Sequence, residues 1–406
     1  MTANTPPTQL ATVASGLSPG HRVQGIDALR GLAVILVVLH HIHLRFQLND
    51  YDVADLLPAP FGTVLFWSGY YAVITFFVIS GFLITTLSLR RWRSLEQIHL
   101  SGFYRLRGAR ILPCLLLLLA VLSLLHVAGA SDFTLKPERA SLGRALAAAL
   151  TFHVNWLEGQ RGYLPANWDV LWSLSVEEAF YVLFPLMCLM LRDERWVMVC
   201  MMTLIAIGPL NRMALAGRDP WNDYAYLSCM DGIAFGCIAA WITARVRLSL
   251  SVLRGAMALG IVLAISIVIW RKQASDLGLM KVGLNITTLE VGVALMLPGL
   301  ARGVGNAVLF KRTAWLQLAG RCSYEIYLTH MFVVLGLMHP FRGLFGAKPA
   351  VSAAYPATYA IMLVLSILLG YAVERWFSHP LNEALRSRLS TTVRCPSPRE
   401  SVEGSP

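Results

Sequence analysis

The sequence predicts an all-α integral membrane protein, a bundle of about ten transmembrane helices with one short re-entrant helix. Hydrophobic residues make up 56% of the 406-residue chain, charged residues make up 14%, and the mean hydropathy is +0.59. A soluble domain usually carries about 25% charged residues, so this chain has too few to cover a water-soluble surface. Lipid must therefore cover much of the molecule.

Ten apolar stretches are long enough to cross a bilayer, which takes about 20 helical residues. They lie at about 26–44, 64–88, 111–129, 171–191, 196–214, 226–244, 252–270, 283–300, 323–339 and 354–376. An eleventh stretch, 143–156, has only about 14 residues and is too short for an ordinary crossing. We interpret it as a re-entrant or interfacial helix on the outer side.

The charges in the loops predict the orientation. With the N-terminus in the cytoplasm, the inside segments hold 21 of the 34 Lys and Arg residues and the outside segments hold 12. Such an excess of positive charge is typical of cytoplasmic loops. Counting 143–156 as a crossing would turn Arg192, Arg195, Arg245 and Arg247 outward, against this rule. We therefore expect a multi-pass protein of the cell (inner) membrane with both termini in the cytoplasm.

The same reasoning sets the predicted domains. Residues 1–24 form a cytoplasmic N-terminal tail, 25–377 the transmembrane domain, and 378–406 a cytoplasmic tail rich in Ser, Pro and Arg that we expect to be disordered. The net charge of +11 resides in membrane-flanking loops, so no nucleic-acid partner is expected. The seven cysteines form no CxxC pair and predict neither disulfides nor a metal site.

The first predicted crossing, GIDALRGLAVILVVLHHI, is unusually polar. Arg30 and His41 are eleven residues apart, about 20° from full register, so they share a helix face. Asp27 lies one turn before Arg30 on nearly the same face. Charged groups within a crossing usually face the bundle interior, although Arg30 could instead reach the headgroups while the histidines only pack. His40 points about 100° away from His41, so the geometry favours His41 as a general base.

The loop after the second crossing contains six arginines. Arg90, Arg91 and Arg93 are explained by orientation alone. Arg107 and Arg110 are three residues apart on a helix that enters the membrane, so they share a face. The arginine fork bonds phosphate oxygens in pairs. We interpret this pair as a site for a phosphorylated cytoplasmic ligand.

The fourth crossing begins with the stretch NWDVLWSLSVEEAFYVLFP. Glu177 and Glu178 lie roughly 7 Å below the outer interface and His41 about 6 Å below it, so either carboxylate could meet the histidine. A carboxylate beside an imidazole orients it and stabilises its charged form. The alternative is an interfacial carboxylate accompanied by the aromatic anchors Trp168 and Trp172.

Weaker signals lie in FFVISGFLIT, where Ser80 and Gly81 could serve helix packing, and in GRCSYEIYLTH, which carries Ser323, Tyr327 and His330. Each is as readily structural as functional. The one GxSxG match, GLSPG at 16–20, lies in the polar N-terminal tail, where no strand-to-helix turn is predicted, and the chain has no HExxH, Walker or GxGxxG motif. This argues against a hydrolase, a zinc peptidase, an ATPase and a dinucleotide-dependent enzyme.

Taken together, these stretches resemble the acyltransferase-3 family, membrane O-acyltransferases that modify sugars and some antibiotics and glycolipids. The matching segments are IDALRGLAVILVVLHH, FFVISGFLITT, FYRLRGARILP, WSLSVEEAFY and GRCSYEIYLTH, in family order. The resemblance implies catalytic roles for His41, Glu177 and Arg30, and donor binding by Arg107, Arg110 and Ser80. It also implies substrate-binding or supporting roles for Asp27, Trp172, Tyr181, Ser323, Tyr327 and His330.

The resemblance further implies the reaction. An acyl group, most often acetyl, would pass from cytoplasmic acyl-CoA to a hydroxyl of a carbohydrate or glycosylated acceptor such as a cell-surface polysaccharide. Acyl-CoA would be a substrate, with no permanently bound cofactor and no metal. Some relatives carry a C-terminal SGNH hydrolase-like domain; this chain leaves no room for one, so we expect direct transfer. The rival classes are a transporter or flippase of lipid-linked sugars or acyl groups and a proton relay, and a proton relay would not need the arginine pair.

Overall fold

The computed structural model describes residues 23–48, 57–305, 312–345 and 354–390, and these ranges contain helices and no strand. Within them, nine helical segments are long and apolar enough to cross a membrane. The helices are α2 (Gln24–Gln47), α4 (Gly69–Trp92), α5 (Leu100–Val127), α8 (Leu171–Leu191), α9 (Glu194–Ala214), α11 (Tyr226–Arg245), α12 (Leu250–Ile269), α14 (Leu284–Ala301) and α18 (Ala354–Val373). The protein is therefore an all-α, multi-pass membrane protein, as predicted.

The tenth predicted crossing, 323–339, corresponds to α17 (Ser323–Phe345). Its 23 residues span about 35 Å at 1.5 Å per residue, enough to cross a bilayer. Its first turns carry buried polar side chains, among them Ser323, Thr329 and His330. Polar groups within a crossing usually face the bundle interior or a cavity.

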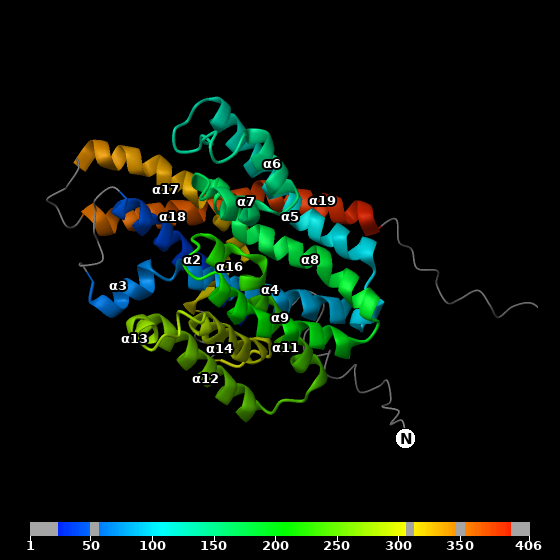
Figure 1. The fold of residues 1–406 in the computed structure, drawn as a ribbon. Coiled ribbons are helices and arrows are strands. Elements are labelled where there is room, and N and C mark those ends of the chain that lie inside the picture. The colour runs from blue at the N-terminus through cyan, green and yellow to red at the C-terminus, as the bar shows by residue number, and fades with distance from the viewer. Residues whose placement is uncertain (1–22, 49–56, 306–311, 346–353, 391–406) are drawn as a thin grey trace, which may run out of the picture.

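Helix α4 occupies the centre of the bundle, and its apolar segment is 72% buried, more than that of any other of the nine. It packs against α2, α11 and α14 (Figure 1). Two glycines allow α4 and α11 to approach closely. A Cβ atom at Gly81 would collide with the backbone oxygen of Ile233, and one at Gly236 would collide with that of Val78. Gly81 therefore serves the helix packing that small residues permit in membranes.

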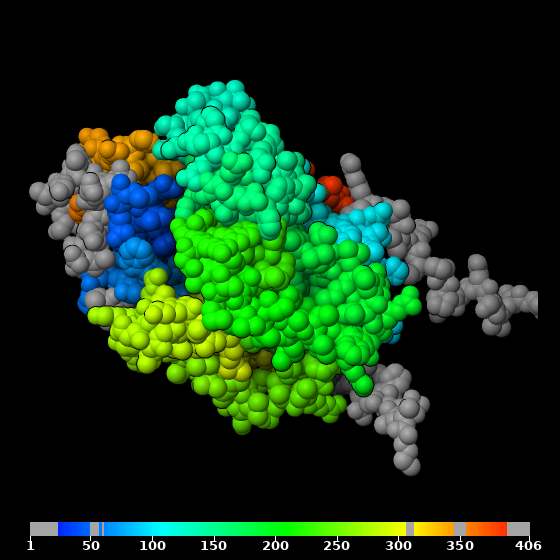
Figure 2. All heavy atoms as spheres, viewed as in Figure 1, coloured from blue at the N-terminus to red at the C-terminus, as the bar shows by residue number. Residues whose placement is uncertain are grey.

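The short stretch 143–156 contains no helix long enough to cross a membrane, and it forms two helices rather than one. These are α6 (Leu142–Leu150) and α7 (Val154–Arg161). Between them Phe152 adopts a positive φ of 57°, which a continuous helix does not allow. Together with the preceding loop they form a lobe at one side of the bundle (Figure 2).

The C-terminal segment differs from the prediction. Helix α18 continues through a π-helical turn, Glu374–Ser378, into α19 (His379–Ser390). The expected disorder is therefore wrong for residues 379–390, while 391–406 lie outside the described residues. Helix α19 packs against α5, and Figure 1 shows it beside the first turns of that helix. Composition favoured disorder because this segment is polar and basic, but contact with α5 stabilises it as a helix.

The remaining elements are short. They comprise α3 (Ala59–Phe66), α10 (Trp221–Tyr224), α13 (Arg271–Asp276), α16 (Ala314–Arg321) and the 3₁₀ turns Leu95–Gln97 and Ala166–Trp168. We call the end of the bundle where α4 finishes and α5 begins the arginine end. We call the end where α2 finishes and α4 begins the opposite end.

Candidate active site

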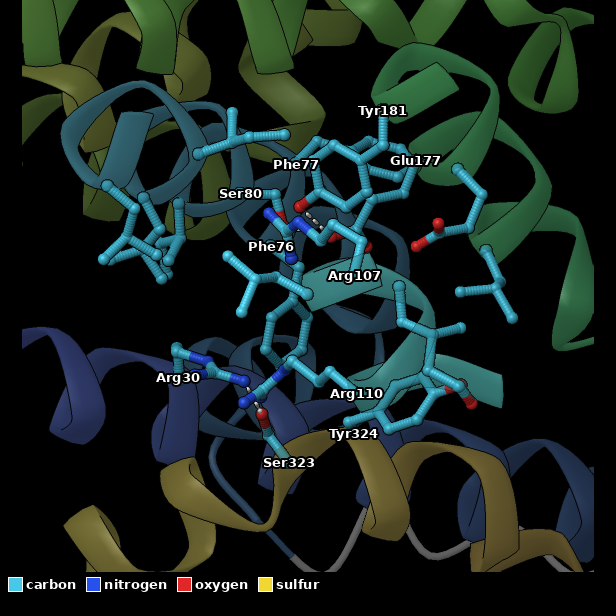
Figure 3. Close-up of a pocket in the computed structure, with 18 of the residues that line it drawn as sticks. Arg30, Phe76, Phe77, Ser80, Arg107, Arg110, Glu177, Tyr181, Ser323 and Tyr324 are labelled. Atoms are coloured by element: carbon cyan, nitrogen blue, oxygen red, sulfur yellow. Dashed lines mark hydrogen bonds between the residues drawn. The ribbon is translucent and has the colours of Figure 1, made fainter. Parts of the chain in front are cut away.

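A cavity of about 580 Å³ lies among α2, α4, α5, α8, α17 and α19 (Figure 3). Along α4 its wall extends from Val73 to Trp92, a rise of roughly 29 Å at 1.5 Å per residue. The cavity is therefore long and narrow, and it runs from the arginine end deep into the bundle. Much of its wall is apolar, with Phe76, Phe77 and Phe103 among the lining residues.

Five arginines line the arginine end of this cavity. They are Arg90, Arg91, Arg107, Arg110 and Arg386. None of the five forms an ion pair with a carboxylate among the residues that the structure describes. Unpaired guanidinium groups of this kind suit a ligand with several phosphate oxygens. The predicted Arg107 and Arg110 pair is thus part of a larger cluster.

Arg107 is held by an aromatic ring. Its Cζ atom lies 3.8 Å from the centroid of the Tyr181 ring, a cation–π contact. The Tyr181 hydroxyl in turn donates a hydrogen bond of 2.5 Å to Oε1 of Glu177. Ser80 donates a second hydrogen bond of 2.5 Å to the same oxygen. Four predicted site residues from α4, α5 and α8 therefore form one connected group, which Figure 3 shows on one wall of the cavity.

This arrangement separates Ser80 from its neighbour Gly81. The glycine faces α11 and serves packing, whereas the serine side chain faces the cavity and binds Glu177. Glu178, which also lines the cavity, is more deeply buried than Glu177. Both carboxylates were candidates from the sequence. Glu177 is the one that accepts the hydrogen bonds from Ser80 and Tyr181.

Arg30 and Ser323 meet across the cavity from this group. The Nη2 atom of Arg30, on α2, donates a 2.8 Å hydrogen bond to Oγ of Ser323, the first residue of α17. Arg110 lies beside them in Figure 3, on the same side of the cavity as Tyr324. Asp27, in the first turn of α2, lies one turn before Arg30. The polar face predicted for the first crossing therefore faces α17 and the cavity.

The inner part of the cavity adjoins a pair of histidines. Tyr327 lines the cavity, and its hydroxyl lies 2.7 Å from Oγ of Ser173. The Tyr327 ring centroid is 6.1 Å from that of His330, and the His330 ring centroid is 4.9 Å from that of His41. Nε2 of His330 lies 3.2 Å from Nδ1 of His41. His41 and His330, which are 289 residues apart in sequence, are thus direct partners.

Glu177 does not join this pair by hydrogen bonding. His41 contacts His330 and the carbonyl oxygen of Val37, while Glu177 accepts from Ser80 and Tyr181. The contact predicted between Glu177 and His41 is therefore not found among the hydrogen bonds of the described residues. Two residues at a similar depth in the membrane meet only if their helices pack side by side. Helix α2 packs mainly on α4, α16 and α17, whereas α8 packs on α7, α9 and α11.

Trp172 supports the site from behind. Its ring stacks on that of Tyr224 with a centroid distance of 4.0 Å, and the side chain is buried. This is a packing role rather than a headgroup anchor. The described residues contain no group of three His, Cys, Asp or Glu side chains placed to hold a metal ion.

Ser173 and Arg386 are among the polar lining residues that the sequence analysis did not single out. Ser173 precedes Glu177 by one turn on α8 and therefore shares its face, a signal that helical spacing could have given. Arg386 lies in a segment whose composition predicted disorder, so nothing in the sequence placed it near α5.

Comparison with known proteins identifies the family. A model of an acyltransferase domain, acyltransferase-3, matches residues 23–375, nearly the whole chain. The chain belongs to the acyltransferase-3 family. It is 29% identical over 240 residues to O-acetyltransferase OatA of Staphylococcus aureus strain NCTC 8325, covering 54% of this chain and 34% of OatA. A putative O-acetyltransferase of S. aureus strain COL is 30% identical over 172 residues, covering 40% of this chain and 24% of the relative.

This acyltransferase-3 chain therefore spans about a third or less of the curated relatives that it matches. No solved structure matches it. The family match covers every predicted site residue from Asp27 to His330. Arg386 lies beyond the matched region, although its side chain lines the same cavity.

Proposed function

We propose that this acyltransferase moves an acetyl group from cytoplasmic acetyl-CoA to a hydroxyl of a carbohydrate or glycosylated acceptor. The observation that carries the proposal is the long cavity, with five unpaired arginines at one end and the His41–His330 pair next to the other. CoA has the matching shape. Its phosphates would bind the arginines, and its extended pantetheine arm would carry the thioester towards Tyr327.

The hydrogen bonds of the two histidines favour one arrangement of protons. Carbonyl oxygens only accept hydrogen bonds, so Nδ1 of His330, 2.8 Å from the Tyr327 oxygen, carries a proton. Nδ1 of His41, 2.9 Å from the Val37 oxygen, carries one for the same reason. The single Nδ1–H of His41 is then shared between the Val37 oxygen and Nε2 of His330, which accepts. This leaves the Nε2 lone pair of His41 as the base.

The proposed reaction follows from this base. The acceptor hydroxyl oxygen attacks the thioester carbonyl carbon while its proton passes to Nε2 of His41. The carbon–sulfur bond then breaks, the acetyl group stays on the acceptor oxygen, and the CoA sulfur leaves and takes up the proton. His330 would be a positioning residue, because its lone pair holds His41 in the basic tautomer. Arg30, roughly 16 Å from His41 along α2 and bonded to Ser323, would line the donor channel.

Glu177 takes a different role from the one first expected. It accepts hydrogen bonds from Tyr181 and Ser80, and Tyr181 carries the Arg107 guanidinium on its ring. We propose that Glu177 positions Tyr181 and thereby Arg107 in the donor site. The excess of Lys and Arg in the loops at the arginine end supports a cytoplasmic location for this end, with both termini on the same side.

The proposal is tested by purifying the protein into liposomes and supplying radiolabelled acetyl-CoA with extracted surface glycans. Mass spectrometry of glycans from cells with and without the protein identifies the acceptor. We expect acetyl ester on a glycan hydroxyl only when the protein is present. Movement of a lipid-linked sugar across the bilayer with no acetyl transfer would instead favour the transporter alternative.

A further inference from the structure

A second cavity of about 310 Å³ lies at the opposite end of α4 from the arginine cluster. It is lined by residues of α4, α9, α10, α13 and α14 and of connecting segments, among them Trp67 directly after α3. Figure 1 shows α3 and α13 at the far side of the bundle from α19. The lining side chains that matter here are Trp67, Tyr70, Tyr71, Arg212, Asn222, Asp223, Arg271, Lys281 and Asn285.

Several polar atoms of this lining have no hydrogen-bond partner among the described residues. Asn285 is only 4% exposed, and its Nδ2 atom donates to the Tyr71 hydroxyl at 3.2 Å, but its Oδ1 atom has no partner. Oδ1 of Asn222 and Nε of Arg212 are also unpartnered. Buried polar atoms are normally hydrogen-bonded, so such atoms around a cavity indicate a polar ligand.

The charges of the lining favour an anion. Arg212 forms a buried ion pair of 2.8 Å with Asp231, so its charge is balanced within the protein. Arg271 and Lys281 form no ion pair among the described residues, and Asp223 is the one carboxylate among the lining residues. Two free cations against one carboxylate leave a surplus of positive charge.

The second cavity also approaches the proposed base. The Trp67 ring, which lines the cavity, has its centroid 6.2 Å from that of His40. The His40 ring is 5.5 Å from that of its neighbour His41. The histidines therefore lie between the two cavities, with Tyr327 on the arginine side and Trp67 on the opposite side. The second cavity is therefore next to His40, and through His40 next to the proposed base, on the side that the donor leaves open.

We propose that this second cavity binds the acceptor, and that the acceptor is a carbohydrate carrying a negative charge. Tryptophan and tyrosine rings suit the apolar faces of a sugar. The amide oxygens of Asn222 and Asn285 would accept hydrogen bonds from sugar hydroxyls. Arg271 and Lys281 would bind the carboxylate or phosphate group. This inference rests on the proposed acetyl transfer and names the acceptor class of that reaction.

The test compares two probes that differ only in the group at carbon 6. These are p-nitrophenyl β-D-glucuronide, which has a carboxylate at carbon 6, and p-nitrophenyl β-D-glucoside, which has a neutral hydroxymethyl group there. Their binding to the purified protein in neutral-lipid nanodiscs is measured by equilibrium dialysis, which needs no catalysis. We expect the glucuronide to bind about tenfold or more tightly, as one charge-assisted hydrogen bond would give. Arg271→Gln and Lys281→Glu should each remove most of this preference.

Lys272 provides the matched control. It neighbours Arg271, is exposed and does not line the cavity, so Lys272→Glu should keep the preference. Equal binding of the two probes, binding of neither, or loss of the preference in Lys272→Glu would overturn the inference. Acetyl transfer from acetyl-CoA is then measured with the surface glycans. Transfer without any preference for charged probes would refute this inference alone, whereas no transfer to any acceptor would refute the proposed function.

Discussion

Replacing Arg107 by alanine should weaken use of the acyl donor far more than it weakens the chemical step. The Arg107 guanidinium lies 3.8 Å from the Tyr181 ring centroid, lines the donor cavity and has no ion pair within the described residues. Its charge is therefore available to a phosphate. A charge-assisted hydrogen bond contributes about 1.5–3 kcal/mol, which corresponds to roughly a tenfold to hundredfold increase in KM for acetyl-CoA.

Lysine at this position should rescue only part of the loss. Lys keeps the charge but lacks the planar fork that bonds two phosphate oxygens and stacks on Tyr181. Arg107→Lys should thus have a KM between those of the natural protein and Arg107→Ala. Arg110→Ala should resemble Arg107→Ala, because both residues line the same end of the cavity.

The assay measures initial rates of acetyl transfer against acetyl-CoA concentration in liposomes matched for protein. Arg105 supplies the control, because it lies on the same helix two residues from Arg107 but is exposed and does not line the cavity. Arg105→Ala should keep the natural KM. An unchanged KM in both Arg107→Ala and Arg110→Ala would remove these residues from the donor site and would refute the reasoning.

Three further predictions concern other parts of the molecule. Arg386→Gln should raise the KM for acetyl-CoA only a few-fold, and more at low salt than at high salt, because salt screens this exposed charge. Arg375→Gln, at an exposed residue that does not line the cavity, should leave the KM unchanged. Initial rates measured over a range of salt concentrations check both expectations. Glu177→Gln should keep the fold but raise the donor KM, since it weakens the hold on Tyr181; an effect on kcat alone would contradict the positioning role. Burial raises the pKa of Glu158 well above its usual value, so this carboxyl group is neutral at neutral pH and Glu158→Gln should leave the thermal unfolding temperature nearly unchanged. Glu158→Ala removes the acceptor, at 2.9 Å, of the Leu164 N–H group. It should therefore lower the free energy of unfolding by about 1–3 kcal/mol.

The sequence predicted the fold class because each membrane crossing requires a long apolar stretch, which can be recognised in the sequence alone. Nine of the ten appear as long apolar helices in the described residues, and the tenth is α17. Helical spacing predicted that Arg30 faces the bundle interior, and there it bonds Ser323 and lines the cavity. It also paired Arg107 with Arg110 on the cavity wall.

What the sequence could not predict is which helices lie side by side. Depth in the membrane suggested that Glu177 meets His41, but depth fixes only the position along the bundle axis. The partner of His41 is His330, on a helix almost 300 residues later. Arg386 was missed for a related reason. The π-helical turn at Glu374–Ser378 connects α18 to α19, and only the contact of α19 with α5 brings this arginine to the cavity.

The comparison of two adjacent histidines tests the central claim most directly. His41 pairs with His330 beside the cavity, whereas Nδ1 of His40 lies 2.7 Å from the backbone oxygen of Phe66. A general base typically contributes about 10²–10⁴-fold in rate. His41→Ala should therefore nearly abolish acetyl transfer while the protein still inserts and binds acetyl-CoA. His40→Tyr should keep most of the activity in membranes matched for protein. If His41→Ala remains active and His40→Tyr does not, His41 is not the base and the proposed mechanism is wrong.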